Sequence, residues 1–342
     1  MTQMPRVALS EVVAIVPAFR AAADLRTCLP ALEAAGIAAD RIVVVDDASG
    51  DDTPDVAAGL GVRVVRADRN GGPAAARNLG IAATTAPVIL FVDADVVIHA
   101  DAPRLLLERL NAPDAPAGVF GSYDDAPAAP GTVSRVRNLM HHHVHQTGTR
   151  EPTTFWTGLG IIRRVALAAV GGFEEGDAYK FVEDVKLGVD LWRKGLSVAL
   201  EPRAQCTHLK RWTLRGAFRT DLFHRALPWT GILMEEGRTP PAQLAGDGAA
   251  RLSVAATAVA GLGLLAAVLG APGTGLAVAV AALGAIAALN RDVLGLVRRR
   301  LGAGALPTAF VVLVSHFLAA GLGAALALVR AGRRRAVGAS GS

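Results

Sequence analysis

Ala86-Pro-Val-Ile-Leu-Phe-Val-Asp-Ala-Asp-Val-Val97 is the stretch on which the interpretation of the whole chain depends. An apolar run rich in β-branched and aromatic residues, opened by a proline and closed by acids, is typical of a buried strand. This strand would deliver Asp93 and Asp95 at its carboxyl end, where open α/β sheets bind ligands. Two carboxylates one residue apart repel each other, and a hard divalent cation would neutralise them and keep positions for a substrate phosphate. A lone Asp-x-Asp is equally compatible with a solvated turn, so the surrounding sequence has to decide.

The residues before this stretch alternate between short apolar segments and helical patterns. Strands are predicted at residues 11–17, 41–45 and 62–66. Helices are expected between them, from Asp24 as N-cap to Gly36, after Asp52 or Thr53, and over residues 74–80. Strands separated by single helices form right-handed crossovers. The sequence therefore predicts an α/β fold with a Rossmann-like, mostly parallel sheet that is covered on both faces.

Acidic or glycine-rich loops follow successive strands of this predicted sheet. They contain Asp46 and Asp47, then residues 70–72, then Asp93 and Asp95. These loops are expected to meet at one edge of the sheet and to form a nucleotide site there. The sequence has neither the G-x-G-x-x-G dinucleotide fingerprint nor a phosphate-loop motif.

The following hundred or so residues continue the α/β pattern. A helix is predicted at residues 100–111, and strands are predicted at 118–123 and 197–202. A second acid pair, Glu183 and Asp184, lies at the start of a helix near residues 181–188, in which Val185, Val189 and Trp192 are spaced for a buried face. Acids at a helix start also stabilise its dipole, which is the simpler interpretation of this pair.

A histidine-rich tract occupies residues 132–146. It contains two arginines and the four histidines His141, His142, His143 and His145. Consecutive histidines on a helix cannot all face one point, so a basic interfacial or acceptor-side helix is favoured over a metal site.

The C-terminal third of the chain has the composition of membrane spans. Hydrophobic residues make up 52% of the 342 residues, and the runs Leu252–Leu289 and Leu306–Val329 contain no Asp, Glu, Lys or Arg. The first run is nearly twice the length of one span, and a Pro-Gly turn near residue 272 divides it into a hairpin. We expect a catalytic domain over residues 1–235, a linker over 236–250, spans near 252–270, 274–290 and 306–329, and a basic tail over 331–342. Whether two or three segments cross the membrane stays open, because three spans would place the last arginines outside.

Charge and cysteine content indicate a compartment and a partner. The net charge of +5 comes largely from arginines beside the apolar runs, in residues 291–300 and 330–335, which suits anionic headgroups better than nucleic acid. The two cysteines form no disulfide framework, and residues 1–10 have no apolar signal region. These features predict a multi-pass protein of the cell (inner) membrane with a cytoplasmic N-terminal domain, whose small-residue helices also suit homo-oligomer packing.

Four blocks in order carry a resemblance to a known family. They are residues 13–20, residues 43–49 with 51–53, residues 71–80 (Gly-Gly-Pro-Ala-Ala-Ala-Arg-Asn-Leu-Gly), and Phe91-Val-Asp-Ala-Asp95. In this spacing they resemble the nucleotide-sugar half of the family-2 glycosyltransferases with the GT-A fold. The resemblance covers about residues 11–229.

The resemblance implies roles for residues on the donor side. Asp93 and Asp95 would bind Mg²⁺ or Mn²⁺, with Asp95 the more direct ligand. The remaining residues expected to contact a UDP- or GDP-linked sugar, together with Asp93, are Pro17, Ala18, Asp46, Asp47, Arg77, Asn78 and Arg211.

The resemblance also implies roles near the acceptor. Asp184 would be the base that takes the acceptor proton, with Glu183 supporting it, and Trp156 and Trp212 would lie on the acceptor side. Processive members carry Gln-x-x-Arg-Trp or Arg-x-x-Arg-Trp, whereas this chain has His208-Leu-Lys-Arg211-Trp212. His208 would instead add a metal ligand or donate to the diphosphate.

These features predict an inverting, metal-dependent, membrane-bound glycosyltransferase of cell-envelope glycan or glycolipid synthesis, with a polyprenyl phosphate or glycolipid as acceptor. An amphipathic helix over residues 215–229 would place its active site above the bilayer. A processive polysaccharide synthase is the main alternative, and product length would distinguish it. A sugar nucleotidylyltransferase should carry a basic Gly-rich loop after the first strand, which residues 17–23 lack. A non-catalytic sugar-nucleotide sensor would have no need of Glu183 and Asp184.

Overall fold

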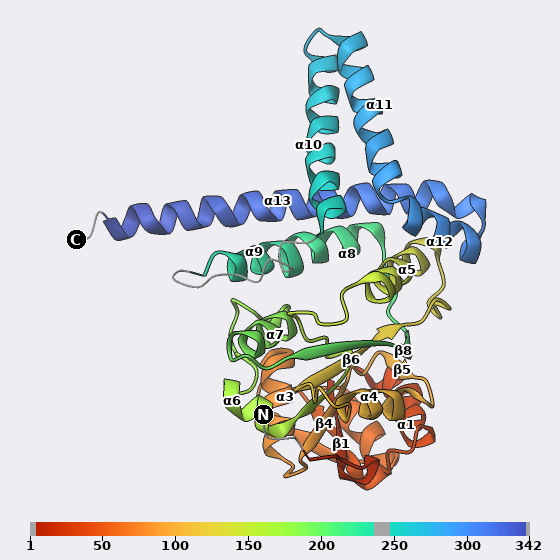
Figure 1. Ribbon diagram of the computed structural model, residues 1–342, viewed down its shortest axis with the longest axis vertical. Helices are drawn as coiled ribbons and strands as arrows, with labels where there is room; N and C mark the ends of the chain where they lie inside the picture. Colours follow the sequence, from red (N-terminus) through yellow and green to blue (C-terminus); the bar gives the residue numbers. More distant parts are fainter. Residues whose placement is uncertain (1–4, 236–246, 340–342) are drawn as a thin grey trace. The chain divides into compact units, whose positions relative to one another are not determined.

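The computed structural model describes residues 5–235 and 247–339. The chain forms two compact units (Figure 1). Unit 1 comprises Met1–Ala129 and His141–Lys210, and unit 2 comprises Pro130–Met140 and Arg211–Ser342. Residues 236–246 of the predicted linker lie outside the described residues.

Unit 1 is built on one eight-stranded sheet in the order β3-β2-β1-β4-β7-β6-β8-β5. The strands are β1 (Val12–Ala18), β2 (Ile42–Asp46), β3 (Arg63–Arg66), β4 (Val88–Val92), β5 (Val96–Ile98), β6 (Gly118–Tyr123), β7 (Leu159–Arg163) and β8 (Val198–His208). The first four strands pair in parallel, as predicted from their helical crossovers, and β6 pairs in parallel with β8. Strands β7 and β5 join antiparallel. The predicted mostly parallel α/β sheet is confirmed, with antiparallel strands added by its second half.

Helices cover both faces of this sheet. They are α1 (Ala22–Ala34), α2 (Thr53–Gly59), α3 (Gly72–Ala82), α4 (Ala102–Leu110), α6 (Arg164–Val170) and α7 (Glu183–Arg193). Buried residues of α1, α2 and α4 form one apolar cluster with the sheet, and those of α3, α6 and α7 form the other. All five residues of β2 and of β4 are buried between these layers, which explains their continuous apolar sequence.

Two local predictions about the helices are wrong. Helix α1 begins at Ala22 with Ala21 as its N-cap, so Asp24 lies in the first turn and does not cap. In α7, Val185 and Val189 are buried as predicted, but Trp192 is 44% exposed. The buried residues of α7 instead include Leu187, Gly188 and Leu191, and α7 approaches the chain so closely that a Cβ at Gly188 would lie 2.4 Å from the backbone of Thr154.

Unit 2 is helical. It contains the first half of α5 (Thr132–Thr147), then α8 (Leu214–Arg219), the π-helical η3 (Thr220–Ala226) and α9 (Leu227–Leu233), followed by α10 (Gly248–Val268), α11 (Pro272–Leu289), α12 (Arg291–Leu301) and α13 (Leu306–Ala339). The predicted amphipathic helix over 215–229 is the run α8–η3–α9. Within the part of the chain that the structure describes, three segments are long and apolar enough to cross a membrane, namely Gly248–Val268, Pro272–Leu289 and Ala303–Gly332. The first two form the predicted hairpin (Figure 1).

Candidate active site

The two acids after β4 lie in a tight turn. The Val96 amide donates to the Asp93 carbonyl at 3.0 Å, and β5 begins there opposite the end of β8, where Val96 pairs with His208. His208 Nε2 consequently lies 3.4 Å from Asp95 Oδ2. The side chains of Asp93 and Asp95 are 33% and 30% exposed. Burial acts to raise the pKa of Asp95, but the His208 hydrogen bond and Lys210 outweigh it and hold that pKa below its usual value.

Arg77 of α3 joins this turn to the second acid pair. Its guanidinium, 4% exposed, donates from Nη2 to Asp93 Oδ1 at 2.7 Å and from Nη1 to Glu183 Oε1 at 2.6 Å. Burial would lower the pKa of Arg77, but the surrounding carboxylates raise it. The described contacts tie the guanidinium to two protein acids, and the predicted contact of Arg77 with the donor stays a prediction. Arg77 connects the Asp-x-Asp turn to α7.

Glu183 and Asp184 open α7. Burial raises the pKa of Glu183 to about 7, although Arg77 opposes the shift. Asp184 is half-buried, and its charge acts on both Arg77 and Glu183. Asp184 Oδ1 also accepts the Val185 amide at 2.7 Å, so this acid stabilises the helix start while it remains beside the cluster.

The acidic loop after β2 is held to neighbouring loops by its own carboxylates. Asp47 is 4% exposed and accepts the amides of Gly71 and Gly72 at 2.8 Å each, at the start of α3. Asp46, equally buried, accepts the Ser49 amide at 3.2 Å. The loop thus has a fixed shape at the carboxyl ends of β1 and β2.

The other predicted donor-side residues divide between two places. Pro17 and Ala18 end β1, where Ala18 pairs with Asp46, so these residues do lie with the acidic loop. Asn78 instead faces the 171–175 turn, exchanging hydrogen bonds of 2.8 and 2.9 Å with the backbone of Phe173. Its amide also donates to Glu175 at 2.8 Å.

Sequence reasoning missed an aromatic cluster beside the Asp-x-Asp turn. The ring of Tyr123, the last residue of β6, stacks on His208 with centroids 4.5 Å apart and packs edge-on against Trp156 at 4.7 Å. His145 of α5 lies 4.9 Å from Trp156, and His142 Nδ1 lies 2.8 Å from the Tyr123 carbonyl oxygen. The second half of the histidine tract therefore packs against the predicted acceptor-side tryptophan. The one sequence feature that pointed to this aromatic cluster was the position of Tyr123 at the end of a predicted strand.

The donor set suits a divalent ion that also takes oxygens from a substrate. Among the residues that the structure describes, no three His, Cys, Asp or Glu side chains are grouped to hold a metal by themselves. Asp95 and His208 are adjacent, whereas Asp93 shares an oxygen with Arg77. This favours Asp95 and His208 as the direct ligands, with the remaining positions left for phosphate oxygens.

Arg211 and Trp212 belong to unit 2. The Trp212 amide donates to Ser134 Oγ at 2.8 Å, and the Arg137 guanidinium lies 5.5 Å from the Trp212 ring centre. The predicted roles of Arg211 and Trp212 at the diphosphate and the acceptor stay predictions.

Comparisons with known proteins agree with this geometry. The sequence matches the family model described as Glycosyl transferase family 2 over residues 13–171. An uncharacterized glycosyltransferase of Mycobacterium tuberculosis (strain H37Rv) is 32% identical over 195 residues, which are 55% of this chain and 86% of that protein. The pre-mycofactocin glycosyltransferase of the same strain is 29% identical over 320 residues, which are 88% of this chain and 64% of that protein.

Another curated relative matches over a shorter segment. The succinoglycan biosynthesis protein ExoO of Rhizobium meliloti is 36% identical over 113 residues, and this chain spans 32% of its length. Among solved structures, a mannosyltransferase of Pyrobaculum calidifontis in complex with GDP-Man and Mn²⁺ aligns with a TM-score of 0.59 at 18% identity. The alignment covers 92% of this chain and 86% of that one, which shows that the two share a fold.

Proposed function

This chain belongs to glycosyltransferase family 2, and from this premise we propose that it moves a sugar, with inversion, from a nucleoside-diphosphate sugar to a lipid-linked acceptor at the cytoplasmic leaflet. The observation that carries the proposal is the Asp93–Arg77–Glu183 connection. It brings the Asp-x-Asp turn and the acids of α7 into one cluster, although 106 residues separate Arg77 from Glu183.

The donor would bind at the carboxyl ends of β1, β2 and β4. Asp46 would face the nucleobase and Asp47 would fix the loop beside it, with Pro17 and Ala18 lining the base and ribose. Asp95 and His208, with Asp93 behind them, would hold Mg²⁺ or Mn²⁺. Such an ion, when bound, screens the diphosphate as a Lewis acid, and the Mn²⁺ in the Pyrobaculum complex supports this choice.

Asp184 is the proposed base. A half-buried carboxylate beside the cluster can take the acceptor hydroxyl proton opposite the departing nucleotide, as inversion requires. Glu183 is buried against Arg77 and supports this geometry without receiving the proton itself. Where the acceptor is an anionic phosphate, Asp184 would orient it more than deprotonate it.

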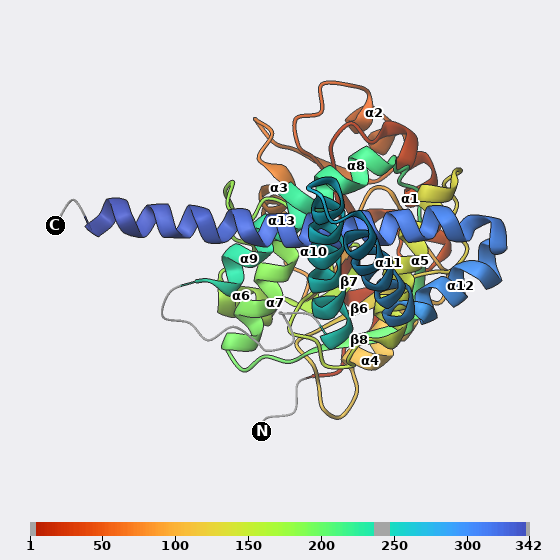
Figure 2. The same ribbon diagram turned by 90° about the horizontal axis from the view of Figure 1, so that it is seen from above.

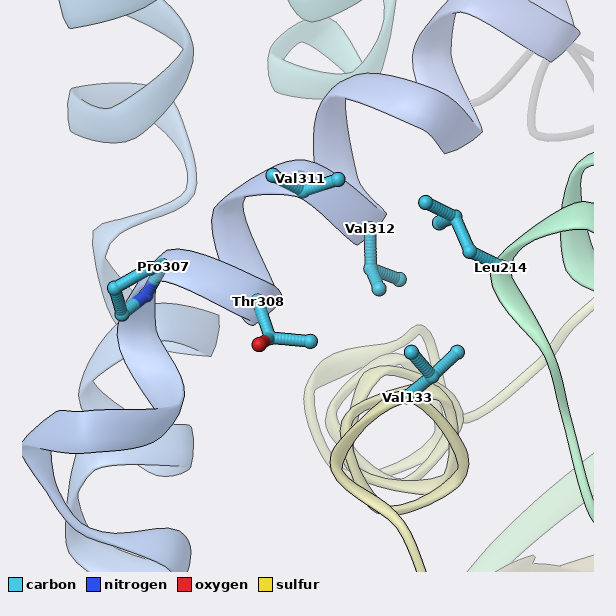
Figure 3. Close-up of a pocket in the computed structure, with 6 residues that line it drawn as sticks. All are labelled: Val133, Leu214, Pro307, Thr308, Val311 and Val312. Atoms are coloured by element: carbon cyan, nitrogen blue, oxygen red, sulfur yellow. The ribbon is translucent and has the colours of Figure 1, made fainter.

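The apolar features of unit 2 support a lipid acceptor. Besides the three apolar segments, this unit has an open hollow of about 340 Å³ lined by six residues. The lining residues are Val133, Leu214, Pro307, Thr308, Val311 and Val312 (Figure 3). Five of the six are apolar, and Val133, Val312 and Leu214 point toward one another in the close-up. Such a lining fits an isoprenoid or acyl chain better than a polar acceptor.

The test is donor hydrolysis and transfer by detergent-purified protein. A panel of UDP- and GDP-linked sugars is incubated with Mn²⁺ or with EDTA, with and without polyprenyl phosphate, and Asp95→Asn serves as the matched control. We expect release of one nucleotide that requires Mn²⁺, rises with the lipid and is lost in Asp95→Asn. Release that is insensitive to EDTA would reject the metal site, and metal-dependent release unaffected by any lipid would reject the acceptor.

A further inference from the structure

Helix α13 has the composition of a membrane span but the neighbours of a surface helix. The apolar segment Ala303–Gly332, which contains most of α13, includes an 18-residue stretch with a mean hydropathy of 2.1. Within unit 2 it packs along η3 and α9 so closely that a Cβ at Gly323 would lie 2.5 Å from the Cβ of Ala226 and 3.1 Å from the Leu222 carbonyl oxygen. Near its start, Ala309 and Val312 join an apolar cluster with Val136 of α5.

A buried polar cluster fastens α13 to these neighbours. Arg137 of α5 donates from both terminal nitrogens to Asp221 of η3 at 2.7 Å each, with both side chains at most 3% exposed. His316 of α13 lies with Nδ1 2.9 Å from Asp221 Oδ2, and Arg225 lies 4.0 Å from Asp221 Oδ1. The cluster therefore ties three helices together through one carboxylate.

The arginines of the run α8–η3–α9, which packs on α13, argue against a membrane crossing by α13. The run α8–η3–α9 carries Arg225 near the cluster and the exposed arginines Arg215 and Arg219. If α13 crossed the bilayer with this run at its side, these arginines and the Asp221 cluster would enter the hydrocarbon, where charged side chains are costly. An orientation in the membrane plane leaves the arginines at the headgroups.

The side chains of α13 divide into two opposite faces. The face toward α5 and η3 holds the buried Ala309 and Gly323 and also His316, whose side chain is 33% exposed. Leu328, 57% exposed, lies apart, but the other large exposed aliphatic side chains form a stripe at helical spacing on the other side. They are Val311, Leu318, Leu322, Leu326 and Val329, which are 40–53% exposed. A helix lying between protein and hydrocarbon has this arrangement, with both faces apolar.

The hairpin α10–α11 differs from α13 in its exposure and in the charges beside it. Its exposed apolar residues include Leu262 at 65%, Val268 at 83% and Val280 at 62%, and its turn at residues 269–271 is uncharged. The hairpin projects from the side of α13 away from α8 and α9 (Figure 1), and α13 runs across its base, as the view from above also shows (Figure 2). Arginines gather at that base, with Arg251 in the first turn of α10 and residues 298–300 in α12.

We propose that only α10 and α11 cross the bilayer, and that α13 lies with α8–η3–α9 in the plane of the cytoplasmic interface. The exposed stripe of α13 rests on the hydrocarbon, and its C-terminal end stays on the side of unit 1. All the arginine clusters then lie on one side of the membrane, as the positive-inside rule requires. This inference rests on the membrane location in the proposed function, but not on the donor or the acceptor.

The first test uses three variants of the full chain, each with one added cysteine. A membrane-impermeant maleimide is added to inverted and to right-side-out vesicles that contain Ser10→Cys, Gly273→Cys or Gly332→Cys. A Cβ at either glycine meets nothing within 4 Å. The native Cys28 and Cys206 are fully buried, and burial raises the pKa of both thiols, so they give little background.

We expect Ser10→Cys and Gly332→Cys to label at least tenfold more in inverted vesicles, and Gly273→Cys to show the reverse. Labelling of Gly332→Cys from the side of Gly273→Cys would overturn the proposal, because α13 would then cross. Labelling of all three from one side would overturn both this proposal and the membrane crossing by the hairpin, and the activity of the same preparations would show whether the glycosyltransferase assignment survives.

Depth measurements give a second test. A fluorophore on Leu318→Cys, near the middle of the apolar part of α13, is compared with one on Val259→Cys in the middle of α10, using lipids with nitroxides at shallow or deep positions. We expect the shallow nitroxide to quench Leu318→Cys at least twice as strongly as the deep one, and the reverse at Val259→Cys. Deep quenching at both positions would overturn the in-plane placement of α13.

Discussion

The Nη1 atom of Arg77 lies 2.6 Å from Oε1 of Glu183, and both side chains are almost fully buried. The same guanidinium holds Asp93 at 2.7 Å. One buried cation thus fixes the distance between the turn proposed to bind the metal and the helix proposed to carry the base. We regard Arg77 as a positioning residue.

Arg77→Met should leave two acids without their cation. Removing one partner of a buried pair costs about 3–5 kcal/mol, so we expect a large fall in the thermal unfolding temperature and loss of transfer activity. The double variant Arg77→Met/Glu183→Gln should recover part of the stability, because one unpaired charge is gone. Arg66→Met, which breaks an exposed pair with Asp55, is the control and should change stability by less than about 1 kcal/mol. Equal stability of Arg77→Met and Arg66→Met would contradict the positioning role.

The ionisation of Glu183 predicts a pH dependence of stability. Its pKa is raised from 4.5 to about 7, chiefly by burial. Between these values the folded chain keeps a proton that the unfolded chain has lost, so the free energy of unfolding falls as the pH rises through this window. Glu183→Gln removes the effect. We expect the stability of the wild type relative to the variant to drop by about 1–3 kcal/mol from pH 5 to pH 8, measured by denaturant unfolding in detergent. A difference that is independent of pH would show that Glu183 is ionised throughout.

Asp184→Asn tests the base. With a hydroxyl acceptor, turnover should fall by roughly 10²–10⁴-fold, the usual range for a general base, whereas the donor KM should change little because Asp184 is assigned no donor contact. With polyprenyl phosphate the loss should be smaller, since an ionised phosphate has no proton to give up. Turnover equal to that of the wild type with both acceptors would remove the assignment.

Asp46 and Asp47 form a matched pair with different expected effects. Asp47→Ala leaves the amides of Gly71 and Gly72 at the start of α3 without their acceptor, which should cost about 1–2 kcal/mol of stability. Asp46→Asn keeps an oxygen for the Ser49 amide, so stability should hold while donor affinity falls if Asp46 contacts the base. Thermal unfolding and donor titration of both variants separate the two roles. A stable Asp47→Ala protein would disprove the capping role.

The sequence was informative where the signal is local. The strand before Asp93 and the acidic loop after β2 follow from runs of a few residues and lie where they were predicted. The Pro-Gly pair predicted the hairpin, although the turn lies at residues 269–271 and Pro272 and Gly273 open α11. The partners of Arg77 could not be predicted, because Glu183 is 106 residues away and an arginine at a helix start equally suits a phosphate. Nor could the stacking of Tyr123 on His208, which depends on β5 bringing β8 beside the Asp-x-Asp turn. Local pattern also failed for Asp24, an acid in the first turn where a cap was expected. For α13, composition predicted an apolar segment of spanning length, which the structure has, but it could not predict the polar contacts of that helix.

The hairpin α10–α11 should depend on close helix packing at Gly275. A Cβ there would lie 2.4 Å from the amide nitrogen of Ala267 and 2.5 Å from the Gly263 carbonyl oxygen. Helices in lipid associate through such close backbone contact, so Gly275→Leu should force them apart. At Gly273, in the first turn of the same helix, a Cβ meets nothing within 4 Å, and Gly273→Leu is the control of identical chemistry. We expect a cysteine pair at Thr257 and Ala282, both inward-facing, to lose oxidative cross-linking by at least fivefold in Gly275→Leu and to keep it in Gly273→Leu. Equal cross-linking in the two variants would mean that the helices do not pack at Gly275.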